Sequence, residues 1–260
     1  MKTDYQKILA AALRAASTAG KYLKETFAQK PDIEYKGKID LVTERDRKSQ
    51  EMIYKIIKDE FPHHSVLGEE NLNIEKDEEL LWLIDPLDGT TNYAHSLPIF
   101  SVSLAFLEQG QTKVGVVYHP MLEEMFQAVE GSGAFMNNKK IMVSEETDLR
   151  KSLLATGFPY DLRESQTNNL DHFSTFSHKA RAIRRCGSAA IDLSYTAAGR
   201  FDGFWELKLS PWDTAAALLF VKEAGGKITD FSGNPFNPFM KECVASNARI
   251  HEQMLAILSS

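Results

Sequence analysis

The sequence predicts a mixed α/β (α+β) fold with two lobes, each built around its own sheet. Residues 100–144 follow a period near two, which is typical of a meander of antiparallel strands. Beyond residue 145, short apolar runs alternate with segments of helical spacing. No Gly/Ser-rich linker separates the halves, so we expect lobes 1–145 and 146–260 to form one compact structural unit.

The N-terminal half begins with helices and then changes to strands. Apolar spacing predicts two helices, at 4–28 and 43–60, and short apolar runs predict two strands, at 65–68 and 81–85. The meander that follows is expected to turn at three places: 108–111, 131–133 and 137–140.

The C-terminal half is expected to alternate strands and helices. The expected strands are 152–158, 181–185, 201–207, 227–231 and 242–246. The expected helices are 170–178, 189–198, 211–226 and a last one at the C-terminus. Helix 211–226 ends on a glycine pair, as helices often do.

Composition excludes several classes of protein. With 260 residues, 43% of them hydrophobic, the chain can bury a large core. A net charge of −6 argues against a broad nucleic-acid-binding face. No apolar run approaches the ~18 residues of a membrane span, so we expect a soluble cytoplasmic protein without membrane contact. Cys186 and Cys243 form no CxxC motif, and no disulfide framework is indicated.

An apolar strand runs directly into two acids in the stretch LWLIDPLDGTT, from Leu81 to Thr91. Asp85 and Asp88 stand three residues apart at the mouth of that strand. Two like charges about 4 Å apart repel by roughly 4 kcal/mol at an effective dielectric near 20. A bound cation would compensate this repulsion, so the stretch indicates a metal site.

Acidic residues end a strand or begin a helix at three places: 68–70, 85–91 and 210–213. The four carboxylates that would converge are those of Glu69, Asp85, Asp88 and Asp213. Their combined charge would be neutralised by two Mg²⁺ ions, and all-oxygen ligands favour Mg²⁺, Mn²⁺ or Ca²⁺. The absence of cysteine and histidine from these motifs argues against zinc.

Each acidic segment also has a purely structural interpretation. Ser210 and Asp213 fit a capping box with proline at the first helical position. Glu69 and Glu70 could belong to a solvated loop, and 85–90 could be an ordinary turn. The joint presence of the three segments favours the metal site.

The residues after Asp88 indicate phosphate chemistry. Gly89 allows close approach of a ligand to the backbone, and Thr90 and Thr91 can open a helix whose free N–H groups bind phosphate. Metals beside an anion-binding helix start suit hydrolysis of a phosphate ester, because metals cancel phosphate charge and generate hydroxide. A cysteine phosphatase is excluded, because no arginine follows Cys186 at the required spacing.

Together these motifs resemble the inositol monophosphatase family of lithium-sensitive, Mg²⁺-dependent sugar phosphatases. The matching segments are DLVTERD at 40–46, GEE at 68–70, WLIDPLDGTTNY at 82–93, RRCGSAAIDL at 184–193, and PWDTAA with EAGG at 211–216 and 223–226. The resemblance covers nearly the whole chain. It implies a layered α/β/α/β/α sandwich and a homodimer.

The resemblance also implies roles for individual residues. Two or three Mg²⁺ ions per site would be held by Glu69, Asp85, the carbonyl of Leu87, Asp88 and Asp213. Thr90, supported by Asp46 and Glu69, would orient the attacking water. The implied phosphate and polyol contacts are Asp88, Gly89, Thr90, Thr91, Ala189 and Glu206. The family often has a lysine before DLVT, and spacing does not choose between Lys36 and Lys38; the segment 157–161 has no clear family match.

The substrate implied first is inositol 1-phosphate, a small polyol phosphate. The alternatives are fructose 1,6-bisphosphate, histidinol phosphate, NADP and 3′-phosphoadenosine 5′-phosphate. The basic run Lys179, Arg181, Arg184 and Arg185 could meet a second phosphate or could be a solvated strand edge. A regulatory or binding protein that keeps the fold without the chemistry is a further alternative.

Overall fold

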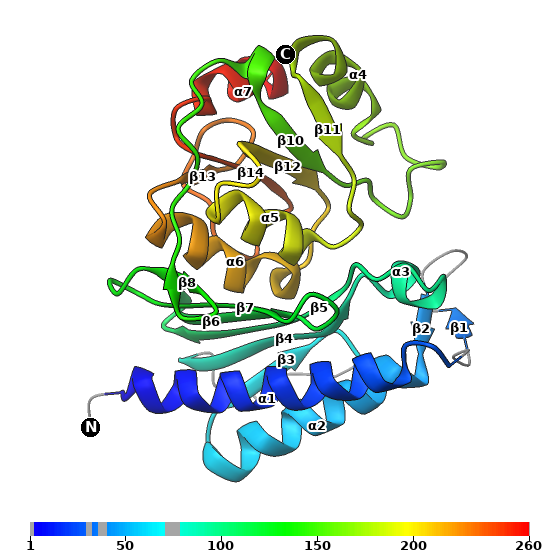
Figure 1. The fold of residues 1–260 in the computed structure, drawn as a ribbon, viewed down its shortest axis with the longest axis vertical. Helices are drawn as coiled ribbons and strands as arrows, with labels where there is room; N and C mark the ends of the chain where they lie inside the picture. Colours follow the sequence, from blue (N-terminus) through cyan, green and yellow to red (C-terminus); the bar gives the residue numbers. More distant parts are fainter. Residues whose placement is uncertain (1–2, 30–32, 36–40, 71–78, 260) are drawn as a thin grey trace.

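The computed structural model describes residues 3–29, 33–35, 41–70 and 79–259. Five layers are stacked as helices, sheet, helices, sheet and helices, from α1 and α2 at the bottom of Figure 1 to α4 and α7 at the top. The predicted mixed α/β class and the layered α/β/α/β/α arrangement are confirmed.

The first layer consists of α1 (Tyr5–Thr26) and α2 (Glu44–Glu60), close to the predicted helices. Asp4 caps α1 through the N–H groups of Gln6 and Lys7, and a capping box opens α2. The buried face of α1 is rich in alanine, which lets the helix lie close to the sheet. Together with α2 it buries one apolar cluster against that sheet.

The larger sheet has the strand order β3-β4-β5-β6-β7-β8-β9. Its strands are β3 (Ser65–Gly68), β4 (Leu80–Asp88), β5 (Ser101–Glu108), β6 (Gln111–His119), β7 (Glu124–Val129), β8 (Ala134–Met136) and β9 (Lys139–Lys140). Only the β3–β4 pair is parallel among these described pairs. Two boundaries were wrong: β4 continues past Asp85 to Asp88, and Lys139–Lys140 pairs as a strand.

The middle layer consists of α5 (Ala189–Ala197) and α6 (Pro211–Glu223), which lie between the two sheets in Figure 1. Both helices are buried nearly all round, because each face meets a sheet or the other helix. Gly115 of β6 allows this packing, since a Cβ there would lie 2.6 Å from the Ala216 carbonyl oxygen of α6.

The smaller sheet has the order β11-β10-β12-β14-β13 and mixes parallel with antiparallel pairs. Its strands are β10 (Leu153–Thr156), β11 (Ala182–Arg184), β12 (Gly203–Leu207), β13 (Lys227–Thr229) and β14 (Glu242–Ser246). The last layer, α4 (Leu170–Lys179) and α7 (His251–Leu258), closes a third apolar cluster on its outer face.

Three short elements were not predicted: β1 (Ile33–Tyr35), β2 (Leu41–Thr43) and a 3₁₀ turn at Leu149–Lys151. Each has three residues, too few for a periodic pattern. The chain leaves the larger sheet after Lys140 and enters the smaller one at Leu153. The lobe boundary near residue 145 stays a prediction.

Two further features concern expectations from composition. In the described part of the chain, none of the helices is long and apolar enough to cross a membrane. Cys186 and Cys243 are both free thiols, the first half-buried and the second buried.

Candidate active site

A cavity of about 570 Å³ lies where the ends of β4, β10 and β12 meet the starts of α3 (Thr90–Ala94), α5 and α6. Ten of the residues predicted for the site line it: Glu69, Asp85, Leu87, Asp88, Gly89, Thr90, Thr91, Ala189, Glu206 and Asp213. Asp46 does not line it but hydrogen-bonds to Thr90. Lys36 and Lys38 lie outside the described residues.

An irregularity in β4 brings Asp85 and Asp88 to the same cavity. Residues three apart in a regular strand point to opposite faces of the sheet. Here Asp85 pairs with Ser103 and Asp88 with Ser101, so the register shifts by one residue between them. A bulge of this kind restores a common face, and the Asp85 carboxylate braces it by accepting the Leu87 N–H at 3.0 Å.

Asp88 links β4 to the start of α5. One carboxylate oxygen accepts hydrogen bonds from the Ser188 hydroxyl and, at 2.9 Å, from the Ala190 N–H. Burial raises the pKa of Asp88 to about 6, and the hydrogen bonds from Ser188, Ala190 and Ser101 oppose that rise. The carboxylate is therefore fixed in place in a poorly solvated position.

Asp213 has both of the roles weighed from the sequence. Its side chain accepts the Ser210 N–H at 2.7 Å in a capping box, with proline as the first residue of α6. The same carboxylate lines the cavity. Burial, and then the charges of Asp88 and Glu69, raise its pKa well above the usual range. The capping role of Asp213 therefore does not exclude a role at the cavity, because the cap holds the carboxylate at the cavity wall.

Asp85 is the acid most surrounded by other acids. Burial is the largest cause of its raised pKa, followed by the charges of Glu69, Asp88 and Asp213. Glu69 is held beside β4 because its N–H donates to the Ile84 carbonyl at 3.2 Å. The four carboxylates predicted to converge are thus close enough to repel one another.

The cavity wall has a large excess of negative charge. Among its described lining residues there are seven acids, Glu69, Asp85, Asp88, Asp161, Asp192, Glu206 and Asp213, against two basic residues, Arg185 and Lys208. Neither histidine nor cysteine is part of that lining. A set of oxygen donors with excess negative charge fits a hard divalent cation such as Mg²⁺ and not zinc.

These acids are not already gathered as ligands around a point. Within the described ranges, no three His, Cys, Asp or Glu side chains stand in a metal-binding cluster. One oxygen of Asp88 and one of Asp213 instead accept hydrogen bonds from the starts of α5 and α6. A cation would bind the second oxygen of each of these two carboxylates.

Thr90 begins α3 and is oriented from behind by Asp46. Its hydroxyl donates to the Asp46 carboxylate at 2.9 Å, while the other oxygen of Asp46 accepts the Thr43 N–H at 2.8 Å. Gly89, just before, has φ +96°, and a Cβ there would lie 3.0 Å from the Ile99 carbonyl oxygen. Only glycine fits this junction without strain.

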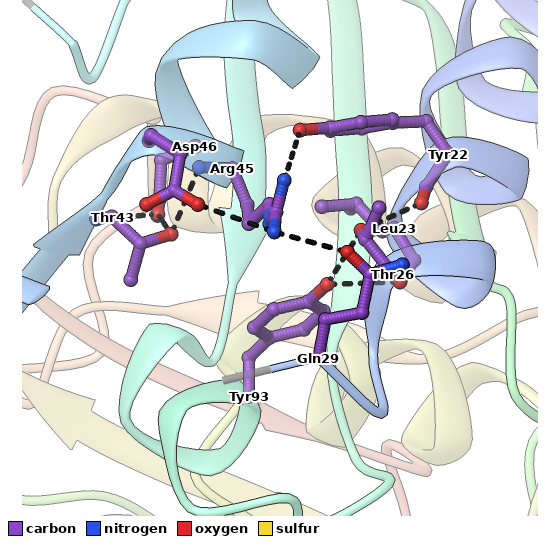
Figure 2. Close-up of polar contacts among 9 residues, drawn as sticks. Tyr22, Leu23, Thr26, Gln29, Thr43, Arg45, Asp46 and Tyr93 are labelled. Atoms are coloured by element: carbon purple, nitrogen blue, oxygen red, sulfur yellow. Dashed lines mark hydrogen bonds and ion pairs between the residues drawn. The ribbon is translucent and has the colours of Figure 1, made fainter. Parts of the chain in front are cut away.

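A polar network behind Asp46 joins α1, α2 and α3 (Figure 2). Arg45, next to Asp46, donates to the Tyr22 hydroxyl at 3.3 Å. The hydroxyl of Tyr93 on α3 lies 2.9 Å from that of Thr26 and donates to the Leu23 carbonyl at 3.0 Å. The start of α3 is thereby tied to the N-terminal helix layer.

Glu206 lines the cavity from β12. Burial, and then the charges of Asp192, Asp213 and Asp88, raise its pKa well above the usual range. Gly157 makes room for it, because a Cβ at 157 would overlap the Glu206 carboxylate. The segment 157–161, which had no clear match to the family pattern, therefore does form part of the cavity wall.

Three functional candidates were missed by reading the sequence. Ser188 holds Asp88, Asn92 donates to the carbonyls of Ile99 and Cys186, and Asp192 has a buried oxygen without a partner in the described structure. Ser188 could have been found as the residue before a predicted helix. Nothing local in the sequence indicates that Asn92 or Asp192 faces a cavity.

Comparison with known proteins shows which family the chain belongs to. The sequence model of the inositol monophosphatase family matches residues 4–260. Nus factor SuhB of Escherichia coli is 41% identical over 94% of this chain and 93% of its own length. The fructose-1,6-bisphosphatase/inositol-1-monophosphatase of Thermotoga maritima is 43% identical over 85% of this chain and 83% of its own.

A solved structure gives the same result in three dimensions. Inositol monophosphatase from Anabaena (Nostoc) superposes with a TM-score of 0.90, at 40% identity, over 99% of this chain and 97% of its own. Members of this metal-dependent family hydrolyse phosphomonoesters. The chain belongs to the inositol monophosphatase family and is a phosphomonoester hydrolase.

Proposed function

We propose that the protein hydrolyses inositol 1-phosphate to myo-inositol and phosphate with Mg²⁺ as cofactor. The observation that carries the proposal is the convergence of four carboxylates and the Gly89–Thr90 helix start on one cavity. The ions would be held by Glu69, Asp85, the Leu87 carbonyl, Asp88 and Asp213. When bound, Mg²⁺ neutralises phosphate charge, lowers the pKa of water and stabilises the leaving alkoxide.

Thr90 is suited to orient the attacking water. Its hydroxyl hydrogen points to the Asp46 carboxylate at 2.9 Å and the Leu87 carbonyl at 3.0 Å, so its oxygen is left to accept a hydrogen bond. A water that donates to this oxygen has its lone pair turned away from Thr90, toward the cavity. Glu69 would take the second hydrogen bond and then the proton, as a general base.

The remaining residues would hold the two ends of the substrate. The N–H groups of Gly89, Thr90 and Thr91 precede the first helical hydrogen bonds of α3, so they are free to bind phosphate oxygens. The N–H of Ala189 and the carboxylate of Glu206 would meet the polyol hydroxyls. Both are expected to affect KM more than kcat.

The test is phosphate release from a panel of substrates, with and without Mg²⁺. The panel contains inositol 1-phosphate, fructose 1,6-bisphosphate, histidinol phosphate, NADP and 3′-phosphoadenosine 5′-phosphate. The highest Mg²⁺-dependent kcat/KM is expected for inositol 1-phosphate. A different leading substrate would replace the proposed one, and no turnover would favour a binding protein without the chemistry.

We also propose that the protein is a homodimer, as the family resemblance implies. Sedimentation velocity should give a species of twice the chain mass at micromolar concentration. A single species of the chain mass would contradict this.

A further inference from the structure

Two segments that are far apart in the sequence meet at the cavity. The first comprises Gly89 and α3, and the second is the turn of residues 186–188 that leads into α5. Phosphate is expected to bind at the start of α3, and the polyol at the start of α5. The spacing between these two helix starts therefore decides whether the site holds both ends of one substrate at once.

The side chain of Asn92 joins the two segments. Its amide nitrogen donates to the Cys186 carbonyl at 2.7 Å and to the Ile99 carbonyl at 2.8 Å. Cys186 belongs to the turn before α5, whereas Ile99 belongs to the segment between α3 and β5. One amide group thus uses both of its hydrogens to connect the segment after α3 with the turn before α5.

Two glycines allow the close approach of these segments. Gly187 has φ +81°, and a Cβ there would lie 3.0 Å from the amide nitrogen of Asn92. A Cβ on Gly89 would lie 3.2 Å from the Gly187 carbonyl oxygen. In a closely packed interior, contacts this short leave little room for a methyl group. A side chain at either position would therefore push the two segments apart.

Asp88 makes a second connection between the same parts of the chain, but of a different kind. Its carboxylate accepts hydrogen bonds from the Ser188 hydroxyl and the Ala190 N–H. As a predicted metal ligand, this carboxylate has to be shared between α5 and a cation. Asn92 is neutral, and its partners are main-chain carbonyls outside the predicted ligand set, so metal binding does not compete with its hydrogen bonds.

We infer that Asn92 is a positioning residue that fixes the spacing between the phosphate-binding start of α3 and the polyol-binding start of α5. The inference rests on the proposed function and adds a residue that decides specificity for substrates with two recognised ends. Both N–H groups of the amide bind protein carbonyls, so Asn92 acts on the substrate through the main chain that it holds. A misplacement of about 1 Å can cost about 10²-fold in rate.

The experiment compares inositol 1-phosphate with methyl phosphate, a phosphomonoester without hydroxyl groups on its organic part. Asn92→Ala should lower kcat/KM for inositol 1-phosphate by about 10²-fold, with part of the loss in KM, because the two ends are no longer held at the correct spacing. For methyl phosphate, kcat/KM should stay within about threefold, since only its phosphate is held. Equal losses for both substrates would show that Asn92 only supports the fold, and would overturn the inference.

Asn247→Ala is the matched control. The Asn247 amide also donates twice, to the Ser144 hydroxyl at 2.9 Å and to the Glu146 carbonyl at 2.8 Å, but Asn247 is not among the described residues that line the cavity. Asn247→Ala should lower the urea midpoint of unfolding and leave the ratio of kcat/KM for the two substrates unchanged.

Gly187→Ala tests the same contact from the other side. Its Cβ would displace the Asn92 amide while residue 92 itself is unchanged. The ratio of kcat/KM for inositol 1-phosphate to that for methyl phosphate should therefore fall, as in Asn92→Ala. An unchanged ratio in Gly187→Ala would contradict the inference.

A binding measurement keeps the test independent of turnover. Thr90→Ala, which retains its main-chain N–H, is titrated calorimetrically in Mg²⁺ with inositol 1-phosphate and with inorganic phosphate, with and without Asn92→Ala. Inositol 1-phosphate should bind about tenfold more weakly when the Asn92 side chain is removed, and inorganic phosphate should bind equally well. Equal affinities for inositol 1-phosphate with and without Asn92, including no binding to either protein, would overturn the inference.

The two proposals fail in different ways. If the wild type hydrolyses inositol 1-phosphate and Asn92→Ala loses the same factor on both substrates, the positioning role of Asn92 alone is refuted. Failure of the wild type to hydrolyse any phosphomonoester would refute the proposed function, and the binding measurement would still decide on Asn92.

Discussion

Single carboxylates in this protein serve the fold and the site together. Asp213 caps α6 with one oxygen and faces the cavity, and Asp88 accepts hydrogen bonds from α5 while facing the same cavity. The hydrogen bonds fix each acid where burial disfavours its ionised form, and at Asp213 the charges of Asp88 and Glu69 add to that effect. Structure and function at these residues can therefore be separated by substitutions that remove charge but keep shape.

Asp213 allows such a separation. Asp213→Asn should lower kcat/KM for inositol 1-phosphate by at least ~10²-fold, about 2.7 kcal/mol, because the charge is lost. The amide oxygen can still accept the Ser210 N–H, so the cap survives. Asp213→Ala removes both the charge and the cap, and its free energy of unfolding should be about 1 kcal/mol lower than that of Asp213→Asn. Activity of the asparagine variant within tenfold of wild type at saturating Mg²⁺ would contradict the metal-ligand role.

Gly89 is the second residue at which geometry predicts function. Gly89→Ala would adopt φ +96° with its Cβ near the backbone of Ile99 and Gly187, so stability and kcat/KM should both fall. Gly110 is the control, since it also has positive φ but its added Cβ would meet nothing within 4 Å. Gly110→Ala should cost about 1 kcal/mol in urea unfolding and leave activity intact. Equal activities for the two variants would show that the backbone conformation at the start of α3 does not affect catalysis.

At the scale of elements, α3 is short and relies on its neighbours. It has five residues, and Tyr93 joins it to α1 through Leu23 and Thr26 (Figure 2). Tyr93→Phe should lower the free energy of unfolding by about 1 kcal/mol and reduce kcat, because the helix start that carries Thr90 is less well fixed. Tyr54→Phe, at an exposed position of α2, is the matched control. An unchanged kcat in Tyr93→Phe would mean that the contacts of Tyr93 do not help to position Thr90.

The junction of α7 with the smaller sheet should be sensitive to pH. The buried His251 ring lies between the hydroxyls of Thr229 and Ser246, at 2.9 and 2.8 Å, and burial lowers its pKa to about 4. In the unfolded chain His251 takes up a proton near pH 6.5, whereas in the folded protein it does so only near pH 4. The free energy of unfolding therefore falls as the pH drops from about 6.5 to about 4.

His251→Gln tests that prediction. Between pH 7 and pH 5, wild type should lose about 2 kcal/mol of unfolding free energy through this residue, and the variant should not. The difference in unfolding free energy between wild type and variant, measured in urea, therefore shrinks as the pH falls. Parallel losses in both proteins would show that His251 does not contribute.

Helices with long periodic patterns of apolar residues could be predicted from the sequence, whereas elements whose extent depends on pairing with a distant part of the chain could not. Helices α1, α2, α5 and α6 follow from spacing and caps. The extension of β4 to Asp88 did not, because its pairing with β5 overrides a proline that locally suggests a turn. Likewise the presence of Glu69, Asp85, Asp88 and Asp213 at one cavity follows from their motifs, whereas Asp192 and Arg185 acquire their position only through tertiary packing.

At the scale of the whole molecule, the site is assembled from both sheets. Glu69, Asp85 and Asp88 come from the larger sheet and its loops, while Glu206 and Asp213 come from the smaller sheet and the middle helix layer. The excess of acids makes the cavity a poor binding site for phosphate until cations balance it. Metal and substrate binding are therefore expected to depend on each other.

The decisive measurement is the rate of phosphate release from inositol 1-phosphate after the protein has been stripped with EDTA, dialysed and titrated with Mg²⁺. The carboxylate cavity predicts negligible turnover without a divalent ion and a saturable return of activity as Mg²⁺ is added. Undiminished turnover in excess EDTA would contradict a mechanism in which these carboxylates act through bound metal.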